Sequence, residues 1–308
     1  MNIVFFGSDD FALAHLEALI ESDNKVVGCV TQSDKAKNRG MKVVISPIKE
    51  CALRNEIEVL QPTDLEDKGF IASLEKLNAD IFVVIAYGRF LPVGLIEMPK
   101  YKAINVHGSL LPKYRGAAPI NWAIINGETE TGITIFRINA KMDAGDLLSE
   151  QKILIDPEDN SATLREKMKK QGQKLLLKTI DEVEVGGSNP RMQIEEEATF
   201  APKLTKKMGL IDWSKTAVEI RNLVRGLQPW PGAYSFYNGK QLKILSAEVI
   251  NIQGNPGEIV DINEKGFVVA ACNKGLLVKE VHLQDANPMD APSFMRGHKL
   301  EIGCKFNS

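Results

Sequence analysis

The chain has 308 residues, of which 44% are hydrophobic and 25% are charged, and its formal net charge is −2. This ordinary globular composition excludes a disordered or low-complexity protein, and at about 100–200 residues per domain the length predicts two domains. The near-zero charge argues against a protein that coats nucleic acid without specificity, because such binding depends on neutralising many phosphates.

The first 180 residues alternate short apolar runs, which predict buried strands, with segments whose apolar residues recur at helical spacing. The predicted strands are residues 2–7, 25–32, 80–88, 103–108, 132–138 and 147–155. The predicted helices are residues 11–20, 48–54, 65–77 and 161–183. This alternation is typical of an α/β fold with a mostly parallel, Rossmann-like sheet and right-handed crossovers.

The pattern changes at residues 184–203, where glycine, proline and three consecutive glutamates indicate a linker. Beyond it, a short helix at residues 217–225 precedes several short strands, and Asn238-Gly239 is a hairpin signal. We therefore predict an α/β domain at residues 1–183 and a small OB-like β-barrel domain at residues 204–308.

The start of the chain and its cysteines favour a cytoplasmic protein. Residues 2–7 form a strand-like segment directly after the initial methionine, without the basic start of a secretory signal. The longest apolar run, at residues 81–87, is too short to cross a bilayer. The four cysteines include no CxxC pair, and only four histidines are present. We expect a cytoplasmic protein without membrane contact or structural metal, and a monomer, since no pattern calls for an oligomer.

Asn105 and His107 are the first candidates for chemistry. They stand two apart in the strand predicted at residues 103–108, so their side chains project from the same face. They lie at the carboxyl end of that strand, where open α/β sheets place their ligands. An amide that donates to a developing oxyanion, beside an imidazole that carries a proton, suits acyl transfer. The spacing alone equally fits an asparagine and a histidine that only satisfy backbone groups.

A carboxylate in the turn at residues 141–146 would orient the imidazole or accept a proton. Asp143 and Asp146 both stand in this turn, and ordinary turn chemistry explains either one taken alone. The sequence leaves the choice between them open.

Two other kinds of site are disfavoured. The first strand is followed by only one glycine of a GxGxxG motif, Gly7, which argues against a nicotinamide cofactor. No serine stands in a GxSxG motif and no cysteine is placed beside a histidine, so the patterns do not indicate a covalent nucleophile.

A basic loop follows the second predicted strand. It contains four cations within SDKAKNRGMK: Lys35, Lys37, Arg39 and Lys42. This loop is either an ordinary solvated loop or a segment that contacts phosphates at the mouth of the site.

Residues 104–134, INVHGSLLPKYRGAAPINWAIINGETETGIT, together with MDAGD at 142–146, resemble the signature of formyltransferases that use 10-formyltetrahydrofolate as formyl donor. The resemblance implies that Asn105, His107 and Asp143 form the catalytic trio and that no metal is needed. It also implies contacts with the folate at the following residues: Tyr87, Phe90, Ser109, Leu110, Leu111 and Pro112.

Further segments resemble the methionyl-tRNA formyltransferase family within this superfamily. They are residues 7–19, 31–52, 198–234 and 294–306. This resemblance implies formylation of methionine on initiator methionyl-tRNA, with Arg39 and Lys42 in contact with the tRNA. The basic loop has fewer glycines and lysines than is usual in that family.

Two alternative functions stay open at this point. The same signature occurs in formyltransferases that act on nucleotide-linked amino sugars, although a basic loop and a β domain favour tRNA. The chain could instead be an RNA-binding protein whose α/β domain has lost its activity, but all three residues of the trio are present. The charge distribution supports a tRNA partner, because residues 1–202 carry a formal charge of −6 and the remainder carries +4.

Overall fold

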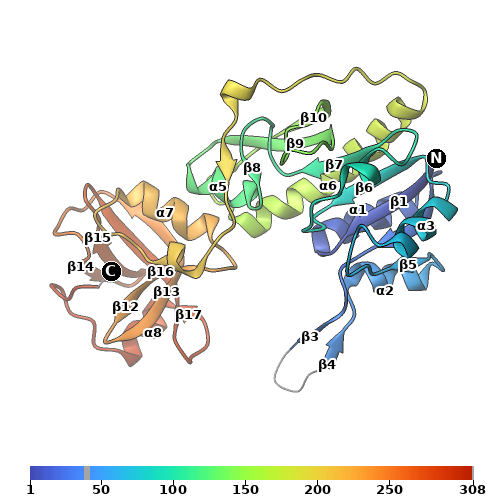
Figure 1. Cartoon of the computed structure of the whole chain (residues 1–308). Helices are drawn as coiled ribbons and strands as arrows, with labels where there is room; N and C mark the ends of the chain where they lie inside the picture. Colours follow the sequence, from blue (N-terminus) through green and yellow to red (C-terminus); the bar gives the residue numbers. More distant parts are fainter. Residues whose placement is uncertain (38–41, 307–308) are drawn as a thin grey trace. The chain divides into compact units, whose positions relative to one another are not determined.

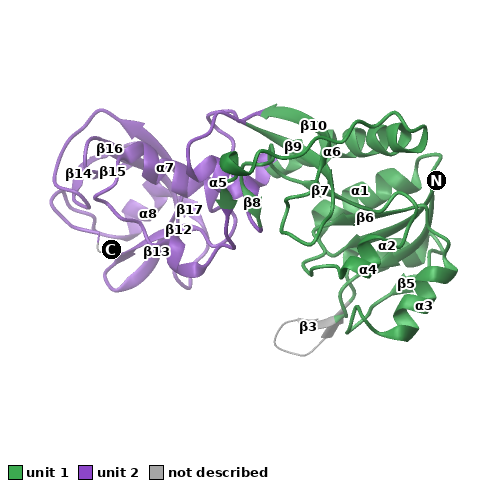
Figure 2. Cartoon of the chain, turned by 45° about the horizontal axis from the view of Figure 1, so that its top comes forward, with its two compact units in different colours: residues 1–116, 131–153, 165–200 green, residues 117–130, 154–164, 201–308 purple. Residues whose placement is uncertain are grey.

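The computed structural model describes residues 1–37 and 42–306, which form two compact units. Unit 1 comprises residues 1–116, 131–153 and 165–200, and unit 2 comprises residues 117–130, 154–164 and those from 201 on (Figure 2). The domain boundaries predicted from the sequence simply follow chain order, whereas compactness assigns two earlier segments to unit 2. Those boundaries stay a prediction.

Unit 1 is built on a seven-stranded sheet with the order β10-β9-β7-β6-β1-β2-β5 (Figure 1). Its strands are β1 (Asn2–Gly7), β2 (Lys25–Val30), β5 (Val59–Leu60), β6 (Ile81–Ile85), β7 (Ala103–His107), β9 (Glu130–Arg137) and β10 (Leu147–Leu154). The neighbours from β7 to β5 pair in parallel, and β9 pairs antiparallel with β7. The predicted α/β fold with a mostly parallel sheet is confirmed.

Helices cover the sheet of unit 1 because its strands are apolar on both faces. In β1, Val4 and Phe6 belong to a core shared with α3 and α4, while Ile3 and Phe5 point to the opposite face, and all four are completely buried. The helices are α1 (Asp10–Ile20), α2 (Pro47–Arg54), α3 (Lys68–Lys76), α4 (Val93–Ile96) and, from Arg165 on, α6 (Ser161–Glu184).

Side-chain caps determine where the first three helices begin. Asp9 caps α1, Ser46 caps α2 and Asp67 caps α3, each by accepting a backbone N–H of the first turn. The cap on α3 explains a difference from the sequence prediction, which extended this helix over residues 65–77. Because Asp67 has the extended backbone of a cap, the helix begins at Lys68.

Short elements complete unit 1. They are the antiparallel pair β3 (Lys35–Lys37) and β4 (Lys42–Val44), the two-residue strand β8 (Arg115–Gly116), and the 3-10 helix η1 (Glu195–Glu197). The two-residue strand β11 (Phe200–Ala201) follows η1 at the boundary between the units.

Unit 2 contains an antiparallel sheet with the order β12-β13-β16-β15-β14, and β17 pairs with β16. Its strands are β12 (Ala233–Tyr237), β13 (Lys240–Ile250), β14 (Ile259–Asn263), β15 (Gly266–Ala270), β16 (Gly275–Leu283) and β17 (Met289–Asp290). Its helices are α5 (Pro119–Ile125), η2 (Lys206–Gly209), α7 (Ala217–Gly226) and α8 (Ala291–Gly297). The predicted small β domain is confirmed, while its closure into an OB-like barrel stays a prediction.

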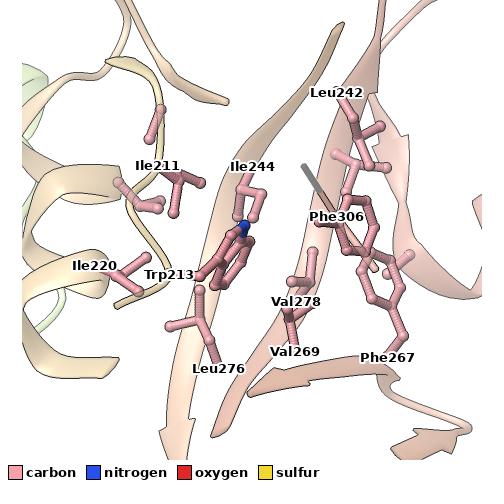
Figure 3. Packing of buried hydrophobic residues seen from close by; sticks show 14 of the residues in the cluster. Ile211, Trp213, Ile220, Leu242, Ile244, Phe267, Val269, Leu276, Val278 and Phe306 are labelled. Carbon is pink, nitrogen blue, oxygen red and sulfur yellow. The ribbon is translucent and has the colours of Figure 1, made fainter. Parts of the chain in front are cut away.

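The core of unit 2 forms around Trp213. Its indole lies among Ile220 of α7 and two sheet residues, Ile244 and Leu276 (Figure 3). The indole Nε1 donates a hydrogen bond to the hydroxyl of Ser235 at 3.3 Å. A buried ring of this size therefore contributes apolar area without leaving its one donor unsatisfied.

Across both units, none of the helices that the structure describes has an apolar stretch long enough to traverse a lipid bilayer.

Candidate active site

Strand β7 carries Asn105 and His107 to the carboxyl edge of the sheet in unit 1. Asn105 pairs with Val84 of β6 and Phe136 of β9, and His107 pairs with Thr134 of β9. Because alternate residues of a strand face the same side, the amide and the imidazole project together. The His107 ring is buried and stands edge-on to Phe136, with 6.4 Å between ring centroids.

Both ring nitrogens of His107 face hydrogen-bond acceptors. Nε2 lies 2.9 Å from the carbonyl oxygen of Tyr114, and Nδ1 lies 3.7 Å from Oδ2 of Asp143. A backbone carbonyl can only accept, so Nε2 carries a proton and donates it to Tyr114. Only the doubly protonated imidazolium presents a proton to both neighbours. The 3.7 Å between Nδ1 and Oδ2 exceeds hydrogen-bond length, so a proton on Nδ1 would not be held in a direct hydrogen bond to Asp143.

Asp143 lies in the turn that connects β9 to β10. Its backbone is left-handed, with φ at +49°, which costs of order 1 kcal/mol for a residue with a side chain. Its Oδ2 accepts the N–H of Gly116 at 2.8 Å. Asp146, the alternative in the same turn, accepts the N–H of Arg137 through its backbone carbonyl at 2.9 Å. The carboxylate that the structure places beside His107 is that of Asp143.

The Asn105 side chain is half-buried and has no hydrogen-bond partner within residues 1–37 and 42–306. A primary amide offers two donors and one acceptor with two lone pairs. The third residue of the predicted trio therefore keeps its donors for a ligand.

The loop after β7 is held in place by Thr134. The Thr134 hydroxyl donates to the carbonyl of Ser109 at 2.7 Å and accepts the N–H of Leu111 at 3.0 Å. Ser109 is completely buried and donates its own hydroxyl to the carbonyl of Lys113 at 2.6 Å, and Leu111 is buried as well. The other two folate contacts predicted in this loop are half-buried: Leu110 and Pro112. The hydroxyl and the carbonyl of Ser109 are both already engaged in these hydrogen bonds, and all four contacts stay predictions.

The loop after β6 carries the remaining two predicted folate contacts. The carbonyl of Tyr87 accepts hydrogen bonds from the Ser8 hydroxyl at 3.2 Å and from Gln32 Nε2 at 2.7 Å. These bonds join the loops that follow β1, β2 and β6. The Tyr87 ring is buried in the core, whereas the Phe90 side chain is 66% exposed. Phe90 is thus the aromatic ring that a flat ligand could stack against, although both contacts stay predictions.

The two predicted tRNA contacts are not placed by the structure. Arg39 lies outside the described residues, and Lys42 is described only by its backbone, which pairs with Lys37 in the β3–β4 hairpin. The base of this hairpin is joined by Thr31 and Ser46, whose hydroxyl oxygens lie 3.1 Å apart. Contacts of Arg39 and Lys42 with tRNA stay predictions.

Residues 191–199, here called the strap, contact the site although they belong to the segment predicted as a linker. The Thr199 hydroxyl accepts the N–H of Tyr114 at 2.9 Å. Gln193 Nε2 donates to the backbone carbonyl of Asp143 at 2.9 Å. Sequence reasoning missed these residues, because a segment rich in glutamate, glycine and proline shows neither helical nor strand periodicity. Its contacts with Tyr114 and Asp143 are seen only in the three-dimensional structure.

The contacts described above among the described residues involve no cysteine. Cys29 and Cys51 are buried and Cys272 and Cys304 are exposed, all four as free thiols. Burial raises the pKa of Cys29 to about 12, so this thiol is not a reactive thiolate at neutral pH. Within the part of the chain that the structure describes, no three His, Cys, Asp or Glu residues are grouped as they would be around a metal ion.

Comparison with known proteins matches residues 1–180 to the family described as formyl transferase and residues 203–299 to formyl transferase, C-terminal domain. The methionyl-tRNA formyltransferase of Caldanaerobacter subterraneus subsp. tengcongensis is 45% identical over 307 residues, covering 98% of this chain and 99% of that protein. The methionyl-tRNA formyltransferase of Agathobacter rectalis is 43% identical over 308 residues, covering 99% of each chain.

Among solved structures, an N-formyltransferase from Helicobacter canadensis in complex with folinic acid and dTDP-3-aminofucose superposes with a TM-score of 0.67. It is 20% identical, and the match covers 90% of this chain and 98% of that one. This likeness shows a shared fold, whereas the matches at 43–45% identity extend over essentially the full length of both proteins. The chain therefore belongs to the methionyl-tRNA formyltransferase family of formyl transferases.

Proposed function

We propose that this chain transfers the formyl group of 10-formyltetrahydrofolate to the free amino group of methionine on initiator tRNA, giving N-formylmethionyl-tRNA for translation initiation. The observation that carries the proposal is the placement of His107, with one ring nitrogen on the Tyr114 carbonyl and the other facing the Asp143 carboxylate. Relatives named methionyl-tRNA formyltransferase over nearly the whole chain support the choice of acceptor.

Asn105 and His107 act on the formyl oxygen. When the amine attacks the formyl carbon, negative charge develops on that oxygen, and preorganised donors stabilise it. The Asn105 amide has its donors available, and a proton on His107 Nδ1 lies in the gap beside Asp143. Each such donor contributes about 10²–10³-fold in rate in comparable acyl-transfer sites.

Asp143 and His107 together move one proton from the attacking amine to the departing nitrogen. The methionine nitrogen forms a bond to the formyl carbon, and the bond from that carbon to the donor nitrogen breaks. Asp143 accepts the proton that the attacking amine loses, His107 gives its Nδ1 proton to the departing nitrogen, and Asp143 then returns its proton to His107.

The residues at the carboxyl edge of the sheet fit a folate. The exposed ring of Phe90 offers a stacking surface, and the half-buried Leu110 and Pro112 offer apolar contact. The structure of the Helicobacter canadensis protein, which shares this fold, is described as a complex with folinic acid. We assign the folate to this edge, and Arg39 and Lys42 to the tRNA.

We further propose that the protein works in the cytoplasm as a monomer and without a metal. Translation initiation supplies the charged tRNA there, and the donors on β7 polarise the formyl group directly.

The test is the choice of acceptor. In separate reactions with 10-formyltetrahydrofolate, the protein is given either charged initiator methionyl-tRNA or a nucleotide-linked amino sugar. Formylation of methionyl-tRNA supports the proposal. Formylation of the sugar alone would assign the chain to the other branch of the superfamily.

A further inference from the structure

Gln193 of the strap connects the turn that carries Asp143 to the buried Arg115. Its Nε2 donates to the backbone carbonyls of Asp143 at 2.9 Å and Gly145 at 2.8 Å. Its Oε1 accepts from Arg115 through Nε at 3.0 Å and through Nη2 at 2.8 Å. One side-chain amide thus uses both of its protons and both lone pairs within the site.

The orientation of this amide follows from its partners. Arg115 can only donate and the two backbone carbonyls can only accept. A flipped amide would direct its NH₂ at the guanidinium and its oxygen at two carbonyl oxygens. Only the observed orientation satisfies the network, so Gln193 is held in one position.

The arginine is itself fixed. Arg115 is 2% exposed, and its Nη1 lies 3.0 Å from each carboxylate oxygen of Glu195. A buried guanidinium needs such partners, because an unpaired charge would be strongly destabilising. The next residue, Gly116, donates its N–H to Asp143 Oδ2 at 2.8 Å. Gln193 therefore joins Arg115 to the backbone of Asp143, and the next residue after Arg115 binds the Asp143 carboxylate.

Contacts with β9 and with Gln193 hold the turn that carries Asp143 in its conformation. Gly145 packs so closely on β9 that a Cβ there would lie 1.6 Å from the carbonyl oxygen of Arg137. Asp143 itself keeps a left-handed backbone, with φ at +49°. Such a backbone persists only where its surroundings hold it. Gln193 donates hydrogen bonds to two carbonyls of this turn, those of Asp143 and Gly145.

We propose that Gln193 is a positioning residue that holds the Asp143 carboxylate towards His107. This inference rests on the proposed function, because it assigns Gln193 an effect on formyl transfer through Asp143. Gln193 does not touch the reacting atoms. Loss of its two donors lets the turn relax and moves the carboxylate away from the imidazole.

The test uses Gln193→Glu, which preserves shape and the bond to Arg115 but directs an oxygen at the carbonyls of Asp143 and Gly145. Displacing a catalytic group by about 1 Å costs about 10²-fold in rate, so kcat should fall by about that factor. The KM values for donor and for tRNA should change by less than about threefold, because neither contact surface is altered. The matched control is Gln173→Glu: Gln173 Nε2 also donates to a backbone carbonyl, that of Ala14. This control should lose stability but keep the wild-type kcat.

A double-mutant cycle with Asp143→Asn separates positioning from a structural role. If Gln193 acts through Asp143, then Gln193→Glu lowers kcat by less than about threefold once the carboxylate is absent. A further loss of about 10²-fold in that background would overturn the proposal, as would a wild-type kcat in the single variant. Should Gln193→Glu fail to fold, Gln193→Met, which removes both donors without adding charge, is taken through the same cycle. A wild-type chain that never formylates methionyl-tRNA would refute the proposed function instead.

Discussion

Replacing Asp143 by asparagine removes one charge and changes almost nothing else. The amide oxygen of the new side chain can still accept the N–H of Gly116, which Asp143 Oδ2 accepts at 2.8 Å. Shape and volume are preserved, and the turn keeps its contacts with Gln193 through the backbone. What is lost is the carboxylate 3.7 Å from His107 Nδ1.

The size of the effect follows from this separation. When His107 carries two protons in the transition state, two unit charges 3.7 Å apart interact by about 4 kcal/mol at an effective dielectric constant of about 20. Both side chains are largely shielded from solvent, at 6% and 17% exposure, so little further screening applies. At about 1.4 kcal/mol per factor of ten, kcat should fall by about 10³-fold.

The assay is steady-state formyl transfer to initiator methionyl-tRNA, with the free energy of unfolding measured by urea in parallel. We expect the KM for tRNA to stay within about threefold of wild type, since Asp143 is not assigned to tRNA binding. The unfolding free energy separates a loss of catalysis from a loss of folding, and the bond from Gly116 survives the substitution. A kcat within about threefold of wild type would refute the claim that the carboxylate charge supports His107.

Three further predictions concern other residues. His107→Ala should lower formyl transfer by at least about 10²-fold while leaving tRNA affinity, measured by filter binding, nearly unchanged; full activity would remove His107 from the mechanism. Arg39→Ala should raise the KM for tRNA and not that for the folate; the opposite pattern would refute the assignment of the loop. Burial lowers the pKa of His15 to about 4 from its ordinary 6.5, so the folded chain binds fewer protons than the unfolded chain between these values. The free energy of unfolding should therefore fall by up to about 3 kcal/mol as the pH drops from 6.5 to 4, and His15→Asn should remove that part of the slope in urea titrations.

The sequence predicted those parts of the site that depend on local periodicity. Strand β7 was visible as an apolar run, and period-two alternation was enough to place Asn105 and His107 on one face. Its position at a carboxyl edge followed from the βα alternation of the segments around it. Each of these inferences uses residues within a few positions of one another.

The family resemblance implied Asp143, but residue patterns alone did not distinguish it from Asp146. Both stand in one turn, and which of them faces His107 depends on the pairing of β7 with β9, where His107 lies opposite Thr134. No local pattern contains that register.

The strap could not be predicted for a related reason. Gln193 meets Asp143 from 50 residues away and Arg115 from 78 residues away. Its neighbours in the chain have the composition of a linker, so only its hydrogen bonds to residues distant in the sequence distinguish it. The burial of Arg115 was equally invisible, because an arginine in a loop is ordinarily exposed.

The most direct test of the central claim is a competition between acceptors in one reaction. The wild-type protein is supplied with 10-formyltetrahydrofolate, charged initiator methionyl-tRNA and a nucleotide-linked amino sugar, and both products are quantified by mass spectrometry. We predict that formyl groups appear on methionyl-tRNA and not on the sugar, and that His107→Ala abolishes the tRNA product. Formyl groups on the sugar alone would contradict the assignment.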